Sequence, residues 1–357
     1  MSHVTAARVV GLSFGPLRTF NDGLGEFSLQ LGRQLAARAE QLRADSGIEL
    51  VYHLPRKYHG RFGDSVRYLA THDLQRLVHW QGTRFALWHS LHQHNRFRAP
   101  LFTRKRLVTV HDLNFAYAKE AAKVRKYVAI HERLLAGCDQ AVAISEHVRA
   151  DIQARLRTKT PVTVVYNGVR DLTRLKPDVL RPLEGKRFFL HVSRMAPTKN
   201  IGALLELARA WPERQFVLVG PQSDYTVQIG MQIDSRGLDN VQLLMDVKDA
   251  QKAWLYAQCD AFLFPSLTEG FGLPPLEAMQ FGKPVFMSDR TCLPEIGADA
   301  AFYWKDFAPL AMRQVVEDAL LAWDPIADAA RARARAAAFT WERCADGYVA
   351  VYRGLLG

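Results

Sequence analysis

The chain of 357 residues has few cysteines and no long apolar run. Its cysteines, at positions 138, 259, 292 and 344, lie far apart, so they match neither a disulfide framework nor a paired-cysteine metal motif. No stretch of about 18 uncharged apolar residues is present, which excludes a membrane-spanning helix. The first residues, MSHVTAARVVGLSF, contain one arginine and no good cleavage site. We interpret them as a strand rather than a signal peptide, and we expect a soluble cytoplasmic protein.

Acidic residues are scarce in the first half of the chain. Residues 1–178 hold 28 Lys and Arg against 15 Asp and Glu, a net charge of +13, whereas residues 179–357 hold 19 against 21. Eleven of the twelve histidines also lie in the first half. This asymmetry indicates two domains with different partners, the first facing an anion. Nucleic acid, phospholipid headgroups and a phosphorylated substrate all remain open as that anion.

Short apolar runs alternate with helix-like stretches in both halves. In the second half, strands are predicted at 187–194, 215–220, 240–245, 261–266 and 284–289, with helices at 200–211, 249–259 and 274–282. In the first half, strands are predicted at 6–14, 49–54, 85–90, 106–112, 140–145 and 162–168, with helices at 25–42, 118–138 and 146–156. Such alternation predicts an α/β protein with two doubly wound parallel sheets. Ligands of such sheets bind where the strands end.

The segment SLTEGFGLPPLEAM (266–279) leaves one predicted strand and begins a helix near Pro274. Glycines before a helix N-terminus let backbone N–H groups approach an anion, which the helix dipole also favours. Glu269 lies in the loop and Glu277 is expected in the first helical turn. One carboxylate can therefore face a sugar and the other a ribose, on either side of a diphosphate. A glycine-rich turn with a favourable N-terminal charge is the alternative.

A second segment, HVSRMAPTKN (191–200), places Arg194 and Lys199 after another predicted strand. The fork of an arginine and the point charge of a lysine both suit a diphosphate. In isolation, two solvated loop charges are the better explanation of this segment.

Together these segments resemble the family-4 retaining glycosyltransferases, whose GT-B fold has two Rossmann-like domains facing across a cleft. Glu269 and Glu277 match the family's E-x7-E signature, and Arg194 and Lys199 match its R-x4-K pair. The run over 281–309 is similar to the family's next stretch.

The resemblance extends to the first half of the chain. The segment RLVTVHDLNF (106–115) looks like the family's strand ending in His-Asp, which implies that His111 contacts the donor sugar; a structural histidine is the alternative. The segment over 14–31 resembles the family's first glycine-rich loop, where we assign Gly25 to the donor, with Gly23 as the alternative. The implied organisation is an acceptor domain (1–172), a linker (173–186), a donor domain (187–338) and a helix that crosses back (339–357).

The implied activity moves a sugar from a nucleotide-diphosphate sugar to a glycan or lipid-linked acceptor, in bacterial cell-surface polysaccharide or lipopolysaccharide synthesis. The implied catalytic residues are Glu269, His111, Arg194 and Lys199. Donor contacts are expected from Gly25, Arg194, Lys199, Glu269, Gly270, Phe271, Gly272, Leu273 and Glu277. No DxD pair is present, so we expect cations and a helix dipole, rather than a metal or another cofactor, to neutralise the leaving diphosphate.

Some features leave other interpretations open. His89, His92 and His94 invite a zinc site, but their spacing does not form one helical face and no carboxylate or cysteine accompanies them. An epimerase or phosphorylase on the same fold is the enzymatic alternative, and a basic nucleic-acid-binding protein is the other. The stretches 96–98, 104–106 and 119–126, with Phe97 and Phe102, predict peripheral contact with an anionic membrane; charge that serves only solubility is the alternative.

Overall fold

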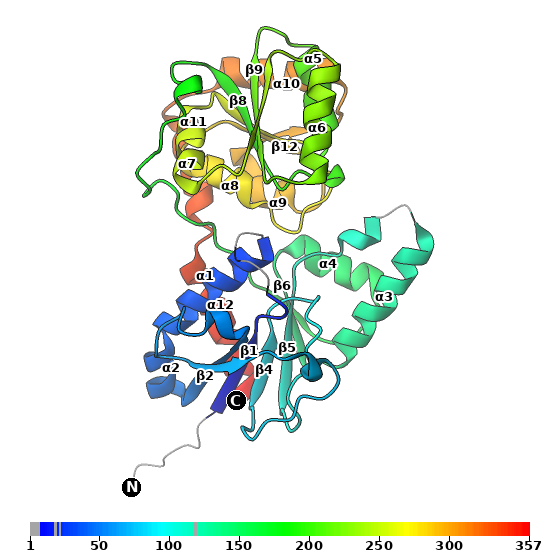
Figure 1. The fold of residues 1–357 in the computed structure, drawn as a ribbon, viewed down its shortest axis with the longest axis vertical. Coiled ribbons are helices and arrows are strands. Elements are labelled where there is room, and N and C mark those ends of the chain that lie inside the picture. Colours follow the sequence, from blue (N-terminus) through cyan, green and yellow to red (C-terminus); the bar gives the residue numbers. More distant parts are fainter. Residues whose placement is uncertain (1–7, 18–19, 21–22, 118–119) are drawn as a thin grey trace. The chain divides into compact units, whose positions relative to one another are not determined.

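The computed structural model describes residues 8–17, 20, 23–117 and 120–357. The chain forms two compact units, one of residues 1–168 and 340–357 and the other of residues 169–339 (Figure 1). The sequence places the first boundary at 172 and an irregular linker at 173–186. In the structure that segment belongs to the second unit, contains a 3-10 turn (Arg181–Leu183) and donates the backbone N–H of Asp178 to the carbonyl of Ala250 at 3.1 Å.

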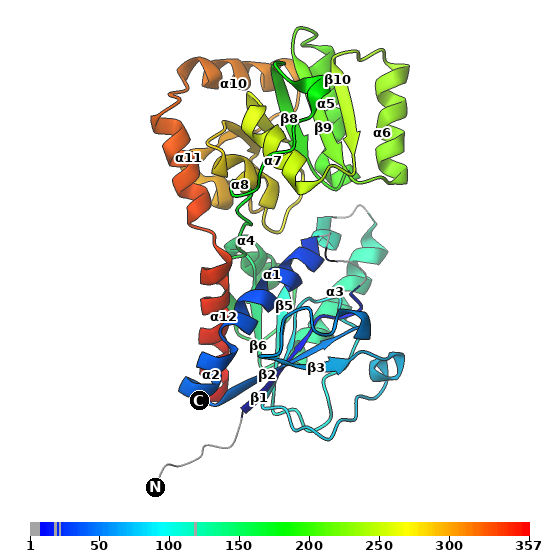
Figure 2. The same ribbon diagram turned by 60° about the vertical axis from the view of Figure 1, so that its left-hand side comes forward.

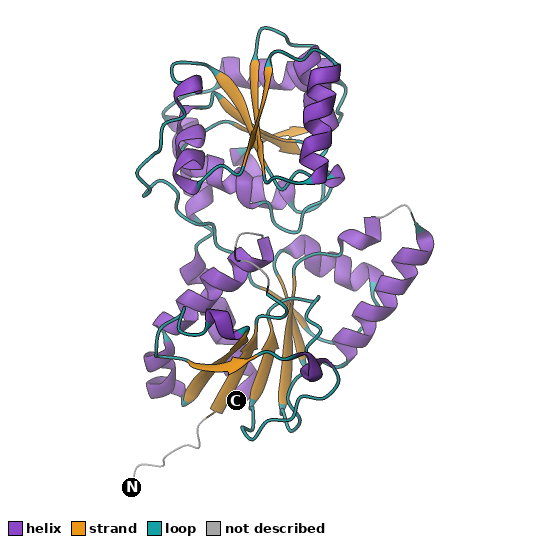
Figure 3. Ribbon diagram, in the orientation of Figure 1, coloured by secondary structure: helices purple, strands orange, loops and turns teal. Residues whose placement is uncertain are grey.

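The first unit is built on a parallel sheet with helices on both faces (Figure 3). Its strand order among the described residues is β3-β2-β1-β4-β5-β6-β7. The strand β1 lies between β2 and β4, and its last four residues are buried, which fits its nearly continuous apolar sequence. The strands are β1 (Arg8–Ser13), β2 (Ile48–Leu54), β3 (Arg67–Ala70), β4 (Leu87–Ser90), β5 (Lys105–Val110), β6 (Gln140–Ala143) and β7 (Val162–Val164). The helices are α1 (Gly23–Ala37), α2 (Ala39–Ser46), α3 (Ala121–Ala136), α4 (Glu146–Arg155) and α12 (Trp341–Leu356).

The last helix, α12, packs beside α1 in this unit (Figures 1 and 2). Phe27 contacts the rings of Trp341 and Tyr348, each with a centroid separation of 6.1 Å. The hydroxyl of Tyr352 lies 2.7 Å from Nδ1 of His89 in the sheet. Buried aromatic rings and hydrogen bonds therefore tie the end of the chain to the first unit.

The second unit has the same design. The order of its described strands is β10-β9-β8-β11-β12-β13, and all neighbouring pairs are parallel. The strands are β8 (Phe188–Val192), β9 (Gln215–Gly220), β10 (Val241–Met245), β11 (Ala261–Phe264), β12 (Val285–Ser288) and β13 (Phe302–Trp304). The helices are α5 (Ile201–Arg209), α6 (Asp224–Ser235), α7 (Asp249–Gln258), α8 (Leu273–Gln280), α9 (Leu293–Gly297), α10 (Pro309–Ala322) and α11 (Ala327–Ala337). The prediction of two doubly wound α/β domains is confirmed.

One predicted helix, over 25–42, is wrong. The structure has two helices there, separated at Arg38. The guanidinium of Arg38 donates to the carbonyl of Gln34 at 2.9 Å and pairs with Asp346 of α12 at 3.1 Å. A cation that satisfies a terminal carbonyl stabilises a helix end, so α1 stops where this side chain turns toward α12. No described helix is long and apolar enough to cross a membrane.

Candidate functional site

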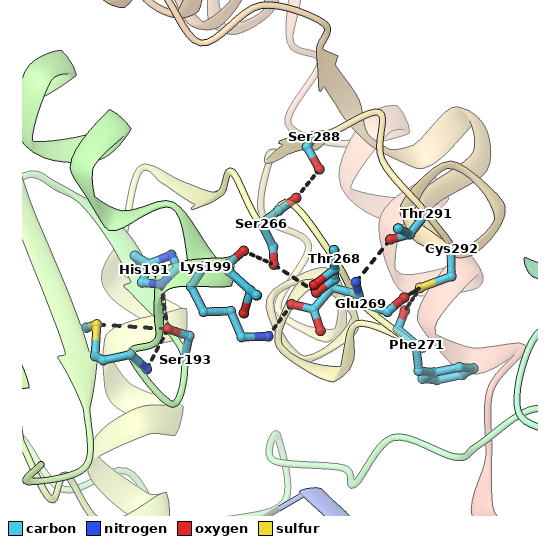
Figure 4. Close-up of polar contacts among 12 residues, drawn as sticks. His191, Ser193, Lys199, Ser266, Thr268, Glu269, Phe271, Ser288, Thr291 and Cys292 are labelled. Atoms are coloured by element: carbon cyan, nitrogen blue, oxygen red, sulfur yellow. Dashed lines mark hydrogen bonds and ion pairs between the residues drawn. The ribbon is translucent and has the colours of Figure 1, made fainter. Parts of the chain in front are cut away.

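The predicted donor residues of the second unit lie on the segments that follow two adjacent strands. β8 and β12 flank β11 in the sheet, and because all three strands are parallel, their carboxyl ends share one edge. The chain reverses its winding direction between β8 and β11, which is where ligands of doubly wound sheets bind. Figure 4 shows the side chains of these loops facing one another.

Lys199 and Glu269 meet at this edge. Lys199 ends a 3-10 turn (Pro197–Lys199) after β8, and its Nζ forms an ion pair with Oε1 of Glu269, on the loop after β11 (Figure 4). Only 11% of the lysine side chain and 12% of the glutamate side chain are exposed. Nζ also lies 5.6 Å from the ring centroid of Phe264. The two residues named separately by the sequence therefore form one nearly buried pair.

Arg194 differs from Lys199 in its surroundings. It lies on the same loop, directly after β8, but its side chain is exposed and makes no hydrogen bond or ion pair with any residue that the structure describes. A guanidinium that is held by no carboxylate keeps all its donors for an incoming anion.

Backbone carbonyls and small side chains fix the relative positions of the loops. The carbonyl of Thr198 accepts hydrogen bonds from the N–H of Leu267 at 2.7 Å and from Oγ of Ser266 at 3.1 Å. The hydroxyl of Ser288, at the end of β12, donates to the carbonyl of Ser266. These bonds join the ends of β8, β11 and β12. The loops that carry Lys199 and Glu269 are therefore held in place independently of the ion pair.

The backbone of Glu269 is held from the β12 side. Its N–H donates to Oγ1 of Thr291 at 3.0 Å, and Sγ of Cys292 donates to its carbonyl at 3.3 Å (Figure 4). The same sulfur lies 3.2 Å from the carbonyl oxygen of Phe271, so its single S–H is shared between the two carbonyls. Burial raises the pKa of the Cys292 thiol well above its usual value, so it stays a neutral donor. This cysteine therefore shapes the loop, and sequence reasoning assigned it no such role.

The loop enters α8 through a backbone that favours glycine. Gly272 has φ 97°, and a Cβ placed there would lie 2.8 Å from Cδ2 of Leu293. Leu273 begins α8, and prolines follow in the first turn, where a missing N–H has no cost. Phe271 is buried and packs edge-on against Phe339, with ring centroids 5.6 Å apart. Its side chain therefore anchors the loop.

Glu277 lies deeper in α8 than expected. α8 begins at Leu273, which puts Glu277 in the second turn, and the prediction of a first-turn carboxylate is wrong. Oε2 of Glu277 accepts a hydrogen bond of 2.7 Å from the hydroxyl of Tyr256 on α7. The pKa of Lys252, also on α7, lies above its usual value. Burial alone would lower this pKa, but the nearby carboxylates of Glu277 and Asp249 have the larger, opposite effect. Neither α7 residue was identified from the sequence, since neither belongs to a recognisable motif.

His111 of the first unit follows β5 and is buried. Its Nε2 donates to the carbonyl of Leu91 at 2.9 Å, and its backbone N–H donates to Oε1 of Gln93 at 3.0 Å. The ring of Phe27 packs edge-on against it at 4.5 Å. Burial lowers the pKa of His111 to about 4, so the imidazole is neutral near pH 7. A neutral ring bonded in this way can orient a hydroxyl, but it has no positive charge with which to stabilise a phosphate.

Gly25 lies in the first turn of α1, not in a loop. Residues 18, 19, 21 and 22 of the expected glycine-rich segment lie outside the described residues. The N-terminal end of a helix favours an anion, so the donor contact of Gly25 stays a prediction.

The clustered histidines have separate surroundings. His89 is buried in β4, and its Nε2 lies 2.9 Å from Oγ1 of Thr109. His94 is exposed, and its ring centroid is 6.5 Å from that of His92. Among the described residues, no group of three or more His, Cys, Asp or Glu could hold a metal ion.

Two family models match most of the chain. The model described as glycosyl transferases group 1 matches residues 174–331, and the model described as Glycosyltransferase Family 4 matches residues 22–171. O-antigen chain mannosyltransferase B of Escherichia coli is 26% identical over 95% of this chain and 97% of its own length. O-antigen chain mannosyltransferase RfbU of Salmonella typhimurium is 28% identical over 56% of each chain, so this chain aligns with about half of that relative.

Solved structures are similar over nearly the whole chain. Sucrose-phosphate synthase from Thermosynechococcus elongatus has a TM-score of 0.75 at 18% identity and covers 98% of this chain and 99% of its own. WaaG, a glycosyltransferase involved in lipopolysaccharide biosynthesis, has a TM-score of 0.68 at 14% identity and covers 96% of this chain and 99% of its own. At these identities the likeness shows the GT-B fold.

Proposed function

The chain belongs to the group 1 and family 4 glycosyltransferases, and from this membership we propose that it moves a sugar from a nucleotide-diphosphate donor to a glycan or lipid-linked acceptor with retention of configuration. The buried Lys199–Glu269 pair, beside the N-terminus of α8, is the observation that carries the proposal. A diphosphate placed there meets the lysine, the exposed Arg194 and the first backbone N–H groups of α8.

Charge on the departing phosphate governs the chemistry of this site. As the bond between sugar and phosphate breaks, Arg194 and Lys199 stabilise the developing negative charge. The acceptor hydroxyl attacks on the same face, and the leaving phosphate takes its proton. Glu269 contacts the sugar and is assigned no nucleophilic role. Nucleophilic attack by the Glu269 carboxylate is the alternative. His111, neutral at pH 7, orients a donor-sugar hydroxyl.

The relatives narrow the substrate. Those named O-antigen chain mannosyltransferases favour mannose as the transferred sugar and an O-antigen polysaccharide as the product. The first half of the chain, with its net charge of +13, favours an acceptor on or beside an anionic membrane, where the enzyme binds peripherally.

A panel of nucleotide sugars, scored by thermal stabilisation, tests the donor, since a ligand that binds the native state raises its melting temperature. Product analysis with and without a glycan acceptor then separates transfer from epimerisation or phosphorolysis. If no nucleotide sugar stabilises the protein, and if it retards nucleic acid in a gel in a salt-sensitive way, the nucleic-acid-binding alternative is favoured instead.

Two substitutions separate the carboxylate roles. Glu277→Ala is expected to weaken binding of the bare nucleoside diphosphate, because its ribose contact does not involve the sugar. Glu269→Ala is expected to leave that affinity unchanged and to lower sugar transfer. Calorimetry on both variants measures this, and an equal loss of affinity in both would contradict the division.

A further inference from the structure

Large apolar side chains are exposed together on two loops of the first unit. Their exposed fractions run from 47 to 76%. Four lie between β3 and β4, and two lie directly before β5. Soluble proteins rarely expose contiguous apolar surface without using it for binding. We call this group the apolar patch: Leu74, Leu77, Val78, Trp80, Leu101 and Phe102.

Hydrogen bonds join the two loops. The N–H of Leu101 donates to the carbonyl of His79 at 2.8 Å, and the N–H of Arg98 donates to the carbonyl of Gln75 at 3.0 Å. Nδ1 of the buried His79 donates to the carbonyl of Arg98 at 2.8 Å. The apolar patch is therefore held in place by the fold beneath it, and its side chains need little further ordering to bind.

Phe102 has a strained backbone conformation although its side chain is exposed. Its φ is 68°, in the left-handed region that large side chains rarely adopt, and the residue is 72% exposed. A residue that is strained and exposed, and that packs little within its own chain, is typical of a functional surface.

Cations outnumber carboxylates around the apolar patch, where the exposed Asp73, next to Leu74 in the sequence, pairs with Arg76 at 2.9 Å. Residues 74–111 contain no Asp or Glu. Within the described part of the chain, no carboxylate pairs with the exposed side chains of four arginines near the apolar patch: Arg84, Arg96, Arg98 and Arg104. The structure corrects two members of the predicted membrane surface: Phe97 is buried against His53, and Lys105 pairs with Asp139 at 2.8 Å. Lys119, in another predicted basic stretch, lies outside the described residues.

We infer that the apolar patch inserts into the headgroup boundary of an anionic bilayer while the surrounding arginines contact lipid phosphates. A large apolar surface rimmed by unpaired cations fits this partner, which offers both acyl chains and negative charge. A second copy of the chain fits poorly, because a two-fold contact would place arginines against arginines. Nucleic acid fits poorly too, because four of the six side chains are aliphatic and bases stack on aromatic rings.

Co-sedimentation with vesicles tests this inference. The chain is expected to bind vesicles of equal parts phosphatidylglycerol and phosphatidylcholine, and not vesicles of phosphatidylcholine alone. The double variant Trp80→Ser/Phe102→Ser is expected to lower partitioning about tenfold or more, since two large apolar side chains leave the interface. Arg98→Ser/Arg104→Ser is expected to weaken binding, and about 0.5 M salt to weaken it further.

The matched control is Leu321→Ser/Ile326→Ser, two residues of the second unit that are 90% and 80% exposed. It is expected to bind vesicles as the unchanged chain does, and unchanged thermal unfolding shows that each variant is folded.

Two results would overturn the inference: the unchanged chain does not bind anionic vesicles, or the Trp80→Ser/Phe102→Ser variant binds them as well as the unchanged chain does. A dimer abolished by Trp80→Ser, without vesicle binding, would assign the surface to a second copy. The inference deepens the proposed membrane-side acceptor, but the assay contains no donor or acceptor, so vesicle binding and sugar transfer can fail separately.

Discussion

The hydroxyl of Tyr256 donates a hydrogen bond of 2.7 Å to Oε2 of Glu277, across 21 positions of sequence. The tyrosine is fully buried on α7, and its ring stacks on that of Phe281 with centroids 5.8 Å apart. The bond occupies one carboxylate oxygen and fixes the plane of the group. In the proposed function, this leaves Oε1 to accept a hydrogen bond from a ribose hydroxyl. We therefore propose that Tyr256 acts through Glu277 as a positioning residue.

Tyr256→Phe keeps the packed ring and removes only the hydroxyl. We expect it to weaken binding of a nucleoside diphosphate roughly fivefold, the scale of about 1 kcal/mol for one hydrogen bond. The loss should disappear for a nucleotide that lacks both ribose hydroxyls. Tyr303→Phe is the control, because that hydroxyl donates to the carbonyl of Ala298, away from Glu277. Equal affinity of Tyr256→Phe and the unchanged chain would remove the positioning role.

Lys199→Ala and Arg194→Ala are expected to differ in stability while both lower turnover. Each should lower kcat about 10²-fold, the scale for one lost stabiliser of transition-state charge. Lys199→Ala also leaves Glu269 nearly buried without its cation, which costs about 3–5 kcal/mol of unfolding free energy. Arg194→Ala should unfold like the unchanged chain, because no described group pairs with it.

Denaturant titration and steady-state kinetics measure these two effects. The double variant Lys199→Met/Glu269→Gln is expected to recover most of the lost stability and none of the activity. Full activity in both single variants would exclude the proposed contact with the diphosphate.

Chelation is expected to leave sugar transfer largely intact. Arg194, Lys199 and the N-terminus of α8 can offset the charge of the leaving diphosphate without a metal. The assay compares initial rates before and after treatment with EDTA. A complete loss that Mg²⁺ or Mn²⁺ restores would show that the reaction requires a divalent ion.

Buried histidines should make the fold sensitive to mild acid. Burial lowers the pKa of His53 and of His89 to about 3, and of His111 and of His191 to about 4. The unfolded chain protonates these rings near pH 6.5, so below that pH the unfolded state binds more protons and the free energy of unfolding falls. Each ring can contribute up to about 1.4 kcal/mol per pH unit.

Thermal unfolding followed between pH 7 and pH 5 measures this, in a window above most carboxyl titrations. Since three of these four histidines lie in the first unit, that unit should lose more stability than the second. A melting temperature that is constant over this window would contradict the prediction.

Local sequence predicted the parts of the site that local structure controls. Apolar strands followed by helices require a parallel sheet, and in such a sheet the residues after β8 and β11 share one edge. The sequence could therefore place Lys199 and Glu269 at one edge of the sheet, but it did not show that their side chains pair. The strand β3 was not predicted, because four partly exposed residues at a sheet edge carry little apolar pattern. The helix over 25–42 was wrong because Arg38 finds its partner on α12, far along the chain.

By itself, the sequence determined the two doubly wound domains and the order of the charged groups along the donor loops, because strand and helix periodicity and motif spacing are properties of neighbouring residues. Only the tertiary structure decided which groups meet and which face water. It paired Lys199 with Glu269, set Tyr256 against Glu277, buried Phe97 and left Trp80 exposed. Burial and pairing depend on how distant segments pack, and that packing determines the charge of His111 and the presence of the apolar patch.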